Sequence, residues 1–253
     1  MAEKKEKDAA ELPGISREAE EHQLAYVIGV AQEHLVQARK AIREANEDLA
    51  DLMEVYDAKD KEGLTLWNNA TARLKEYKQN MVRLETARKE TYFGRIDFLA
   101  EEKQQKEAYS IGRVGIYGAD AQPLVLDWRA PIASVYYESG LGSCSYTVLS
   151  EGTHTIDLER KRTYEIENDR LKDYFDSDVV ANDELLTKYL AKSKKNVLGE
   201  IIATIQKEQN LLIRRSPRTN LIVQGVAGSG KTTVALHRIS YILYNYKEDF
   251  RPE

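Results

Sequence analysis

The chain has 253 residues, of which 42% are hydrophobic and 31% charged, which suits one or two soluble domains with long solvated helices. Its net charge of −5 neither requires nor excludes a nucleic-acid partner. The single cysteine, Cys144, excludes an internal disulfide and a cysteine metal cluster, and no apolar run is long enough for a membrane-spanning helix.

The first 15 residues are rich in charged side chains and contain no apolar core of the kind that a signal peptide needs. We therefore expect a disordered tail at residues 1–15. The lone cysteine fits a reducing compartment, so we expect a cytoplasmic protein.

Two apolar seams with heptad spacing follow, which predict a long antiparallel coiled-coil arm at residues 16–92. The first seam consists of Leu24, Ile28, Ala31, Leu35, Ala38, Ile42, Ala45, Leu49, Leu52 and Tyr56, and the second of Trp67, Ala70, Leu74, Tyr77, Met81 and Leu84. A short loop over residues 59–65, containing Gly63, connects them. Residues 16–57 have a net charge of −6 and residues 58–90 of +3, which favours pairing of the two helices.

Such an arm has two interpretations: a dimerisation coiled coil, or an arm that reaches into a partner. In the second case the contacts belong at the tip, where the candidate partner-binding residues are Asp57, Asp60, Glu62, Leu64, Leu66 and Trp67. The acids could approach a metal ion in the partner. Lys59 and Lys61 alternate with them, however, so we expect the tip to act by steric occupation and apolar contact.

Short alternating runs punctuated by glycines predict a small antiparallel β domain at residues 93–168. Its most distinctive stretch, LVLDWRAPIASVYY, places Asp127 and Arg129 on either side of Trp128. We interpret these two charges as a structural ion pair. Helical patterns return after Asn168, and seven bases against two acids between residues 192 and 218 suit either phosphate contacts or a solvated helix face.

The segment NLIVQGVAGSGKTTVALHRI has the form of a phosphate-binding loop, with an expected strand at residues 221–224 before it and an expected helix at residues 231–246 after it. Glycines let successive N–H groups point at phosphate oxygens, while the lysine neutralises phosphate charge. The candidate residues are Gly225, Ala227, Gly228, Ser229, Gly230, Lys231, Thr232 and Thr233. The Thr232 hydroxyl is the expected Mg²⁺ ligand, and ATP the expected cofactor.

The stretch QGVAGSGKTTVALHRISYIL resembles the first motif of superfamily 1 helicases of the UvrD and Rep type, including His237 and Arg238. In those helicases an upstream glutamine recognises adenine. The resemblance assigns this role to Gln209, 22 residues before Lys231, with Gln206 as the alternative.

The hairpin, the LVLDWRAPIASVYY segment and the phosphate-binding loop together resemble the HelD family of helicase-like proteins, over residues 16–253. This resemblance implies that the arm enters the secondary channel of RNA polymerase. It also implies that ATP use helps release or recycle stalled polymerase from nucleic acid, so RNA polymerase core enzyme is the expected partner and DNA or RNA a further one.

The expected fold class is α+β, with the arm, the β domain, and a helical linker followed by a truncated RecA-like domain at residues 169–253. No acidic ATPase motif follows Thr232. We therefore expect a monomeric N-terminal fragment that alone hydrolyses no ATP. Two functions stay open for the full-length protein: an ATP-driven motor, or a polymerase-binding module without catalysis. A DNA-unwinding helicase with a dimerising arm is a further alternative.

Overall fold

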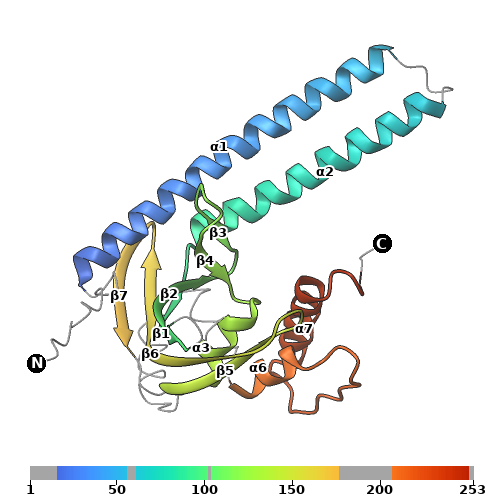
Figure 1. Cartoon of the computed structure of the whole chain (residues 1–253). Helices are drawn as coiled ribbons and strands as arrows, with labels where there is room; N and C mark the ends of the chain where they lie inside the picture. The colour runs from blue at the N-terminus through green and yellow to red at the C-terminus, as the bar shows by residue number, and fades with distance from the viewer. Residues whose placement is uncertain (1–15, 56–60, 102–103, 177–206, 251–253) are drawn as a thin grey trace, which may run out of the picture.

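The computed structural model describes residues 16–55, 61–101, 104–176 and 207–250. Two long helices form an arm that projects from a β-sheet, and shorter helices lie beside the sheet (Figure 1). The fold class is α+β, as predicted. None of the helices in the described ranges has the length and apolar character needed to cross a bilayer.

The arm consists of α1 (Arg17–Val55) and α2 (Lys61–Lys89). Both predicted helices are confirmed, and their seams face one another, with Leu35 and Leu74 buried and Leu49 half-buried. Helix α2 begins at Lys61, inside the predicted loop, so that Gly63 is a buried helical residue. The end of the first seam, Tyr56, lies outside the described residues.

The root of the arm is held by an apolar cluster between α1 and the sheet. Leu24, Val27 and Ala31 of α1 contribute to it together with Val125 and Tyr164 of the sheet. Burying these side chains anchors the first turns of α1 to the β domain. The distal half of the arm extends away from the sheet (Figure 1).

A buried carboxylate lies beside this cluster. The Glu20 Oε1 atom accepts a hydrogen bond from Arg162 Nη1 at 2.6 Å and lies 3.3 Å from Arg95 Nη1, while Oε2 accepts one from the Tyr164 hydroxyl at 2.8 Å. Asp97 in turn pairs with Arg95 at 2.6 Å. Because each buried charge faces opposite charges and hydrogen-bond donors, the desolvation cost of the root is offset.

Within the described residues the sheet has seven strands, in the order β3-β4-β2-β1-β6-β5, with β7 also paired to β6. Their bounds are β1 Gly94–Ala100, β2 Gln105–Gly112, β3 Ile116–Tyr117, β4 Pro123–Asp127, β5 Gly142–Val148, β6 Gly152–Glu167 and β7 Arg170–Asp176. Arg95 and Asp97 lie on the face of β1 that contacts Glu20 at the root of the arm. Ile96 and Phe98 lie on the opposite face and belong to a second apolar core.

The sheet differs from the prediction at two places. The predicted antiparallel pairing holds for the other strand pairs, but β2 and β4 pair in parallel. The chain passes from β2 to the outer strand β3 and folds back as β4 between them, so β4 runs in the direction of β2. The sheet also continues past residue 168, since Asn168 and Asp169 adopt positive φ and turn the chain into β7.

The remaining described elements are the 3-10 turn η1 (Pro131–Ala133) and the helices α3 (Ser134–Glu138), α6 (Lys207–Arg214) and α7 (Lys231–Asn245). Helix α7 confirms the helix predicted after the phosphate-binding loop. Ile213 of α6 and Val234 and Tyr241 of α7 belong to the second apolar core, with Trp128 and α3. Both helices therefore dock on the β domain.

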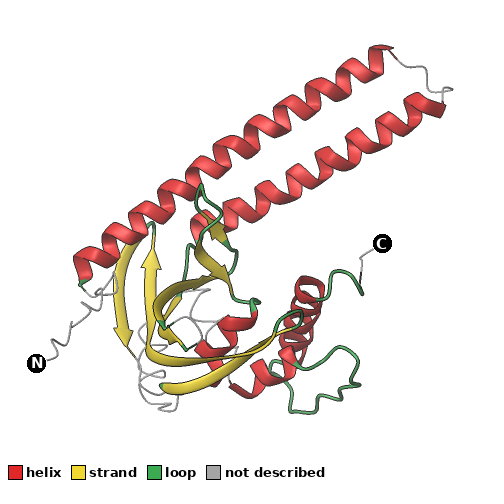
Figure 2. Cartoon of the chain, in the orientation of Figure 1, coloured by secondary structure: helices red, strands yellow, loops and turns green. Residues whose placement is uncertain are grey.

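The predicted strand at residues 221–224 is wrong. Residues 215–230 are loop (Figure 2), and Ile222 is 95% exposed. A strand needs a neighbour to accept its backbone hydrogen bonds. None of the described strands pairs with this segment.

Candidate nucleotide-binding site

The glycine-rich loop between residues 225 and 230 has the backbone conformation that its glycines permit. Gly228 and Gly230 both have φ of +82°, in the left-handed region. A Cβ atom at Gly225 would lie 2.7 Å from the Ser229 hydroxyl oxygen, so a side chain there would collide with the loop. Gly230 is also the N-cap of α7, which leaves the first N–H groups of this helix directed at the loop.

Lys231, the first residue of α7, folds back over this loop. Its Nζ atom donates hydrogen bonds to the carbonyl oxygens of Gly225 at 2.9 Å and Val226 at 2.6 Å, and lies 3.4 Å from Ser229 Oγ. The ammonium group is therefore held among the loop's own oxygens, next to the helix N-terminus. A phosphate oxygen could replace these neutral acceptors, because an anion is favoured at a helix N-terminus.

The other predicted residues lie around the same loop. Ala227, Gly228, Ser229 and Thr232 are exposed, whereas Thr233 is half-buried. Within the described ranges, no group of three or more His, Cys, Asp or Glu side chains is arranged to hold a metal ion. The fit to Mg²⁺ thus rests on the exposed Thr232 hydroxyl alone.

Gln209 of α6 lies beside the loop, although it precedes Lys231 by 22 residues in sequence. A Cβ atom on Gly230 would be 3.6 Å from Gln209 Nε2. Gln209 Oε1 is buried and has no hydrogen-bond partner among the described residues. An amide oxygen without a partner can accept a hydrogen bond from a ligand once the side chain turns to expose it. The alternative, Gln206, lies outside the described residues.

The LVLDWRAPIASVYY segment joins the β domain to these helices. Arg129 pairs with Asp127 at 2.6 Å, in agreement with the predicted structural ion pair, and also donates to the Ser240 hydroxyl of α7 at 3.0 Å. The Trp128 ring contacts the His237 ring edge-on, with centroids 5.3 Å apart. Burial, together with the positive charge of Arg113, lowers the pKa of His237 below its ordinary value.

Arg214, which also connects this segment to α6, was not selected from the sequence. It is half-buried and donates to the carbonyl oxygens of Trp128 at 2.5 Å and Ala130 at 3.1 Å. Its acceptors are backbone atoms more than 80 residues away, as the separations of 86 and 84 show. No local pattern identifies such a contact.

The predicted tip residues lie at the far end of the arm. Leu64 is 51% exposed and Leu66 is 38% exposed, while Trp67 is half-buried in the seam and Glu62 is exposed. Met53 and Val55, which the sequence analysis did not select, are 64% and 74% exposed at the end of α1. Asp57 and Asp60 lie outside the described residues.

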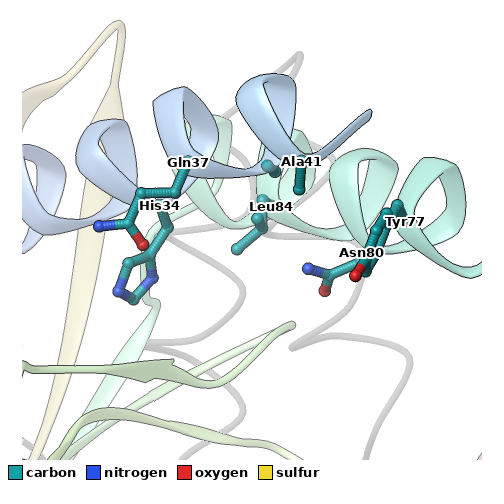
Figure 3. A pocket seen from close by; sticks show the side chains of 7 residues that line it. His34, Gln37, Ala41, Tyr77, Asn80 and Leu84 are labelled. Atoms are coloured by element: carbon teal, nitrogen blue, oxygen red, sulfur yellow. The ribbon is translucent and has the colours of Figure 1, made fainter. Parts of the chain in front are cut away.

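A separate cavity of about 290 Å³ opens between the two helices of the arm (Figure 3). It is lined by His34, Gln37, Ala38, Ala41, Tyr77, Asn80 and Leu84. Small alanines on α1 leave this space. The lining has no lysine or arginine with which to bind a phosphate, so the cavity adds nothing to the nucleotide site.

A comparison with models of known protein families gives a match. The family model described as DNA helicase IV HelD, N-terminal domain, matches residues 28–191. A search of curated proteins found no significant match. The matched range covers most of the arm and the whole sheet and ends before the glycine-rich loop, so the family match and the loop motif are independent observations.

Proposed function

The chain belongs to the family of the HelD N-terminal domain, found in helicase IV-type proteins, and from this membership we propose that it is the N-terminal part of an ATP-dependent motor that acts on RNA polymerase. The arm would bind the polymerase through its secondary channel. ATP use by the full-length protein would help release or recycle stalled polymerase from nucleic acid.

The arrangement of the arm and the loop on one sheet is the observation that supports this proposal most. Strand β4 contributes Val125 to the apolar cluster at the root of the arm. Two and three residues later, Asp127 and Trp128 belong to the joint with α7, whose first residue is Lys231. The arm and the glycine-rich loop are thus attached to the same short segment of chain, which supports a motor that acts through its arm.

The residues around the loop fit ATP. Lys231 would exchange the carbonyl oxygens of Gly225 and Val226 for phosphate oxygens, and the N–H groups at the start of α7 would orient the same phosphates. Gln209 would bind the adenine edge through its amide. Bound Mg²⁺ would supply neutralisation of the phosphate charge, with the Thr232 hydroxyl as its ligand from this chain.

The exposed apolar side chains at the end of the arm favour a steric tip. Met53, Val55, Leu64 and Leu66 are all more than a third exposed. Large apolar side chains clustered at the end of an extended element mark a protein contact. We propose that they dock in the partner, in preference to chelation of a metal by tip acids.

Binding of core RNA polymerase by this chain in a pull-down tests the partner, and loss of binding in the double variant Leu64→Ser, Leu66→Ser tests the tip. The triple variant Asp57→Asn, Asp60→Asn, Glu62→Gln is the matched control. Retained binding by the leucine variant with loss by the acid variant would refute the steric tip.

ATP hydrolysis by the full-length protein separates the motor from a non-catalytic module. We expect turnover that increases with polymerase and is abolished by Lys231→Ala. Polymerase binding without any turnover would leave the binding module as the function.

A further inference from the structure

Arg238 of α7 makes a set of contacts that the proposed phosphate chemistry does not use. Its Nη1 atom lies 2.9 Å from the carbonyl oxygen of Leu212, 3.3 Å from that of Ile213 and 2.7 Å from that of Arg215. Its Nη2 atom donates to the carbonyl oxygen of Ser216 at 3.0 Å. One guanidinium group thus gathers four backbone carbonyls at the C-terminal end of α6.

The C-terminal end of α6 depends on such contacts, because the last carbonyl groups of a helix have no partner within it. An arginine supplied from a neighbouring helix satisfies them and complements the negative end of the helix dipole. Arg238 therefore caps α6 and fixes its C-terminal end against α7.

Helices α6 and α7 also carry the two sides of the proposed adenine-binding site. Gln209 lies on α6, shortly before the carbonyls that Arg238 binds, and Gly230 is the N-cap of α7. On its other side α6 is held by Asn210, which donates to Glu138, and by Arg214. The position of Gln209 relative to the loop therefore depends on how α6 and α7 are fastened together.

We propose that Arg238 is a positioning residue for base recognition: it sets the distance from the Gln209 amide to the glycine-rich loop and thereby gives the site its preference for adenine. This inference rests on the proposed nucleotide site. The amide can donate to N7 and accept from the N6 amino group of adenine, whereas hypoxanthine presents an oxygen at C6 that repels the amide oxygen.

The test is calorimetric titration of this chain with ADP and with IDP in the presence of Mg²⁺. Protein contacts to base edges discriminate by roughly 5- to 150-fold, so the unaltered chain should prefer ADP within that range. In Gln209→Ala the preference should disappear. In Arg238→Met it should fall to within about twofold of Gln209→Ala, and combining the two substitutions should change it no further, because Arg238 acts through Gln209.

Two variants control for damage to the fold. Arg218→Met removes an arginine whose side chain is 83% exposed, and should keep the full preference for ADP. Arg238→Lys keeps the charge but loses the planar fork, and should give an intermediate preference with unchanged helical circular dichroism. If Arg238→Met does not fold, the preference of Arg238→Lys for ADP over IDP tests the proposal. A preference equal to that of the unaltered chain contradicts it.

Two other outcomes would overturn the assignment: an undiminished preference for ADP in Arg238→Met, or equal weakening of ADP and IDP, which a purely structural role would give. Failure of the proposed function looks different. In that case the unaltered chain binds neither nucleotide, and Lys231→Ala changes nothing.

Discussion

Glu20 is the residue on which the root of the arm depends most. It is 1% exposed and contacts Arg95, Arg162 and Tyr164. We expect Glu20→Ala to lower the free energy of unfolding by about 3–5 kcal/mol, because it leaves buried arginines without their counter-charge. Urea unfolding measures this. Glu21→Ala is the control, since Glu21 forms an exposed pair with Arg17 and should cost less than about 1 kcal/mol.

His237 gives the joint a dependence on pH. Its lowered pKa means that the folded chain resists protonation more than the unfolded chain, whose histidines titrate near about 6.5. The unfolded state therefore binds more protons below that pH, and the stability that His237 contributes is lost as the pH falls below it. The fall in Tm between pH 7.5 and 5.5 should be smaller for His237→Asn than for the unaltered chain. An identical fall in both would contradict a role for His237.

The charged root shows why single residues were harder to predict than patterns. Glu20 stands four residues before Leu24, at a position where the seam would continue, yet its partners lie 75 to 144 residues away. Only the fold brings them together. The glycine-rich loop was predictable because its chemistry is local: the glycines, Lys231 and the helix that follows are adjacent in sequence.

At the scale of elements, the burial of the seam decreases along the arm. Leu35 is 3% exposed, whereas Leu49 nearer the tip is half-buried. We expect Leu35→Ala to cost about 2–5 kcal/mol and Leu49→Ala about 1 kcal/mol, because less apolar surface and less packing are lost near the tip. Urea unfolding followed by helical circular dichroism distinguishes the two. Equal costs would mean that the arm is packed uniformly.

Helices and strands differed in how far sequence patterns determined them. The two arm helices and α7 were predicted to within a few residues, since helical periodicity needs only neighbouring residues. The parallel pairing of β2 with β4 depends on how a two-residue strand folds back, which alternation does not reveal. Residues 221–224 have the apolar pattern of a strand but no partner in the described part of the chain.

For the whole molecule, the contacts around Asp127 and Trp128 connect the β-sheet, from which the arm projects, to α7, which follows the glycine-rich loop. We expect Asp127→Asn to weaken the pair with Arg129, and with it the contact of Arg129 to Ser240. Hydrogen exchange should then rise in α7 and stay unchanged in α2, because the root of the arm has its own cluster. Glu159→Gln, at the exposed pair with Lys106, is the control. Equal increases in both helices would mean that the domain unfolds as one unit.

The separation in sequence between Glu20 and its partners also sets an order in time. Arg162 follows Glu20 by 142 residues, and Leu171, whose carbonyl oxygen accepts a hydrogen bond from Arg17, follows Arg17 by 154. At a synthesis rate of 5–20 residues per second, roughly 7 to 30 seconds pass between the emergence of the two sides of the root. The first helix therefore leaves the ribosome long before the strand that anchors it. The apolar seam of α1 can pair with α2 as soon as α2 is synthesised. The arm therefore forms first, and its orientation relative to the sheet is fixed last.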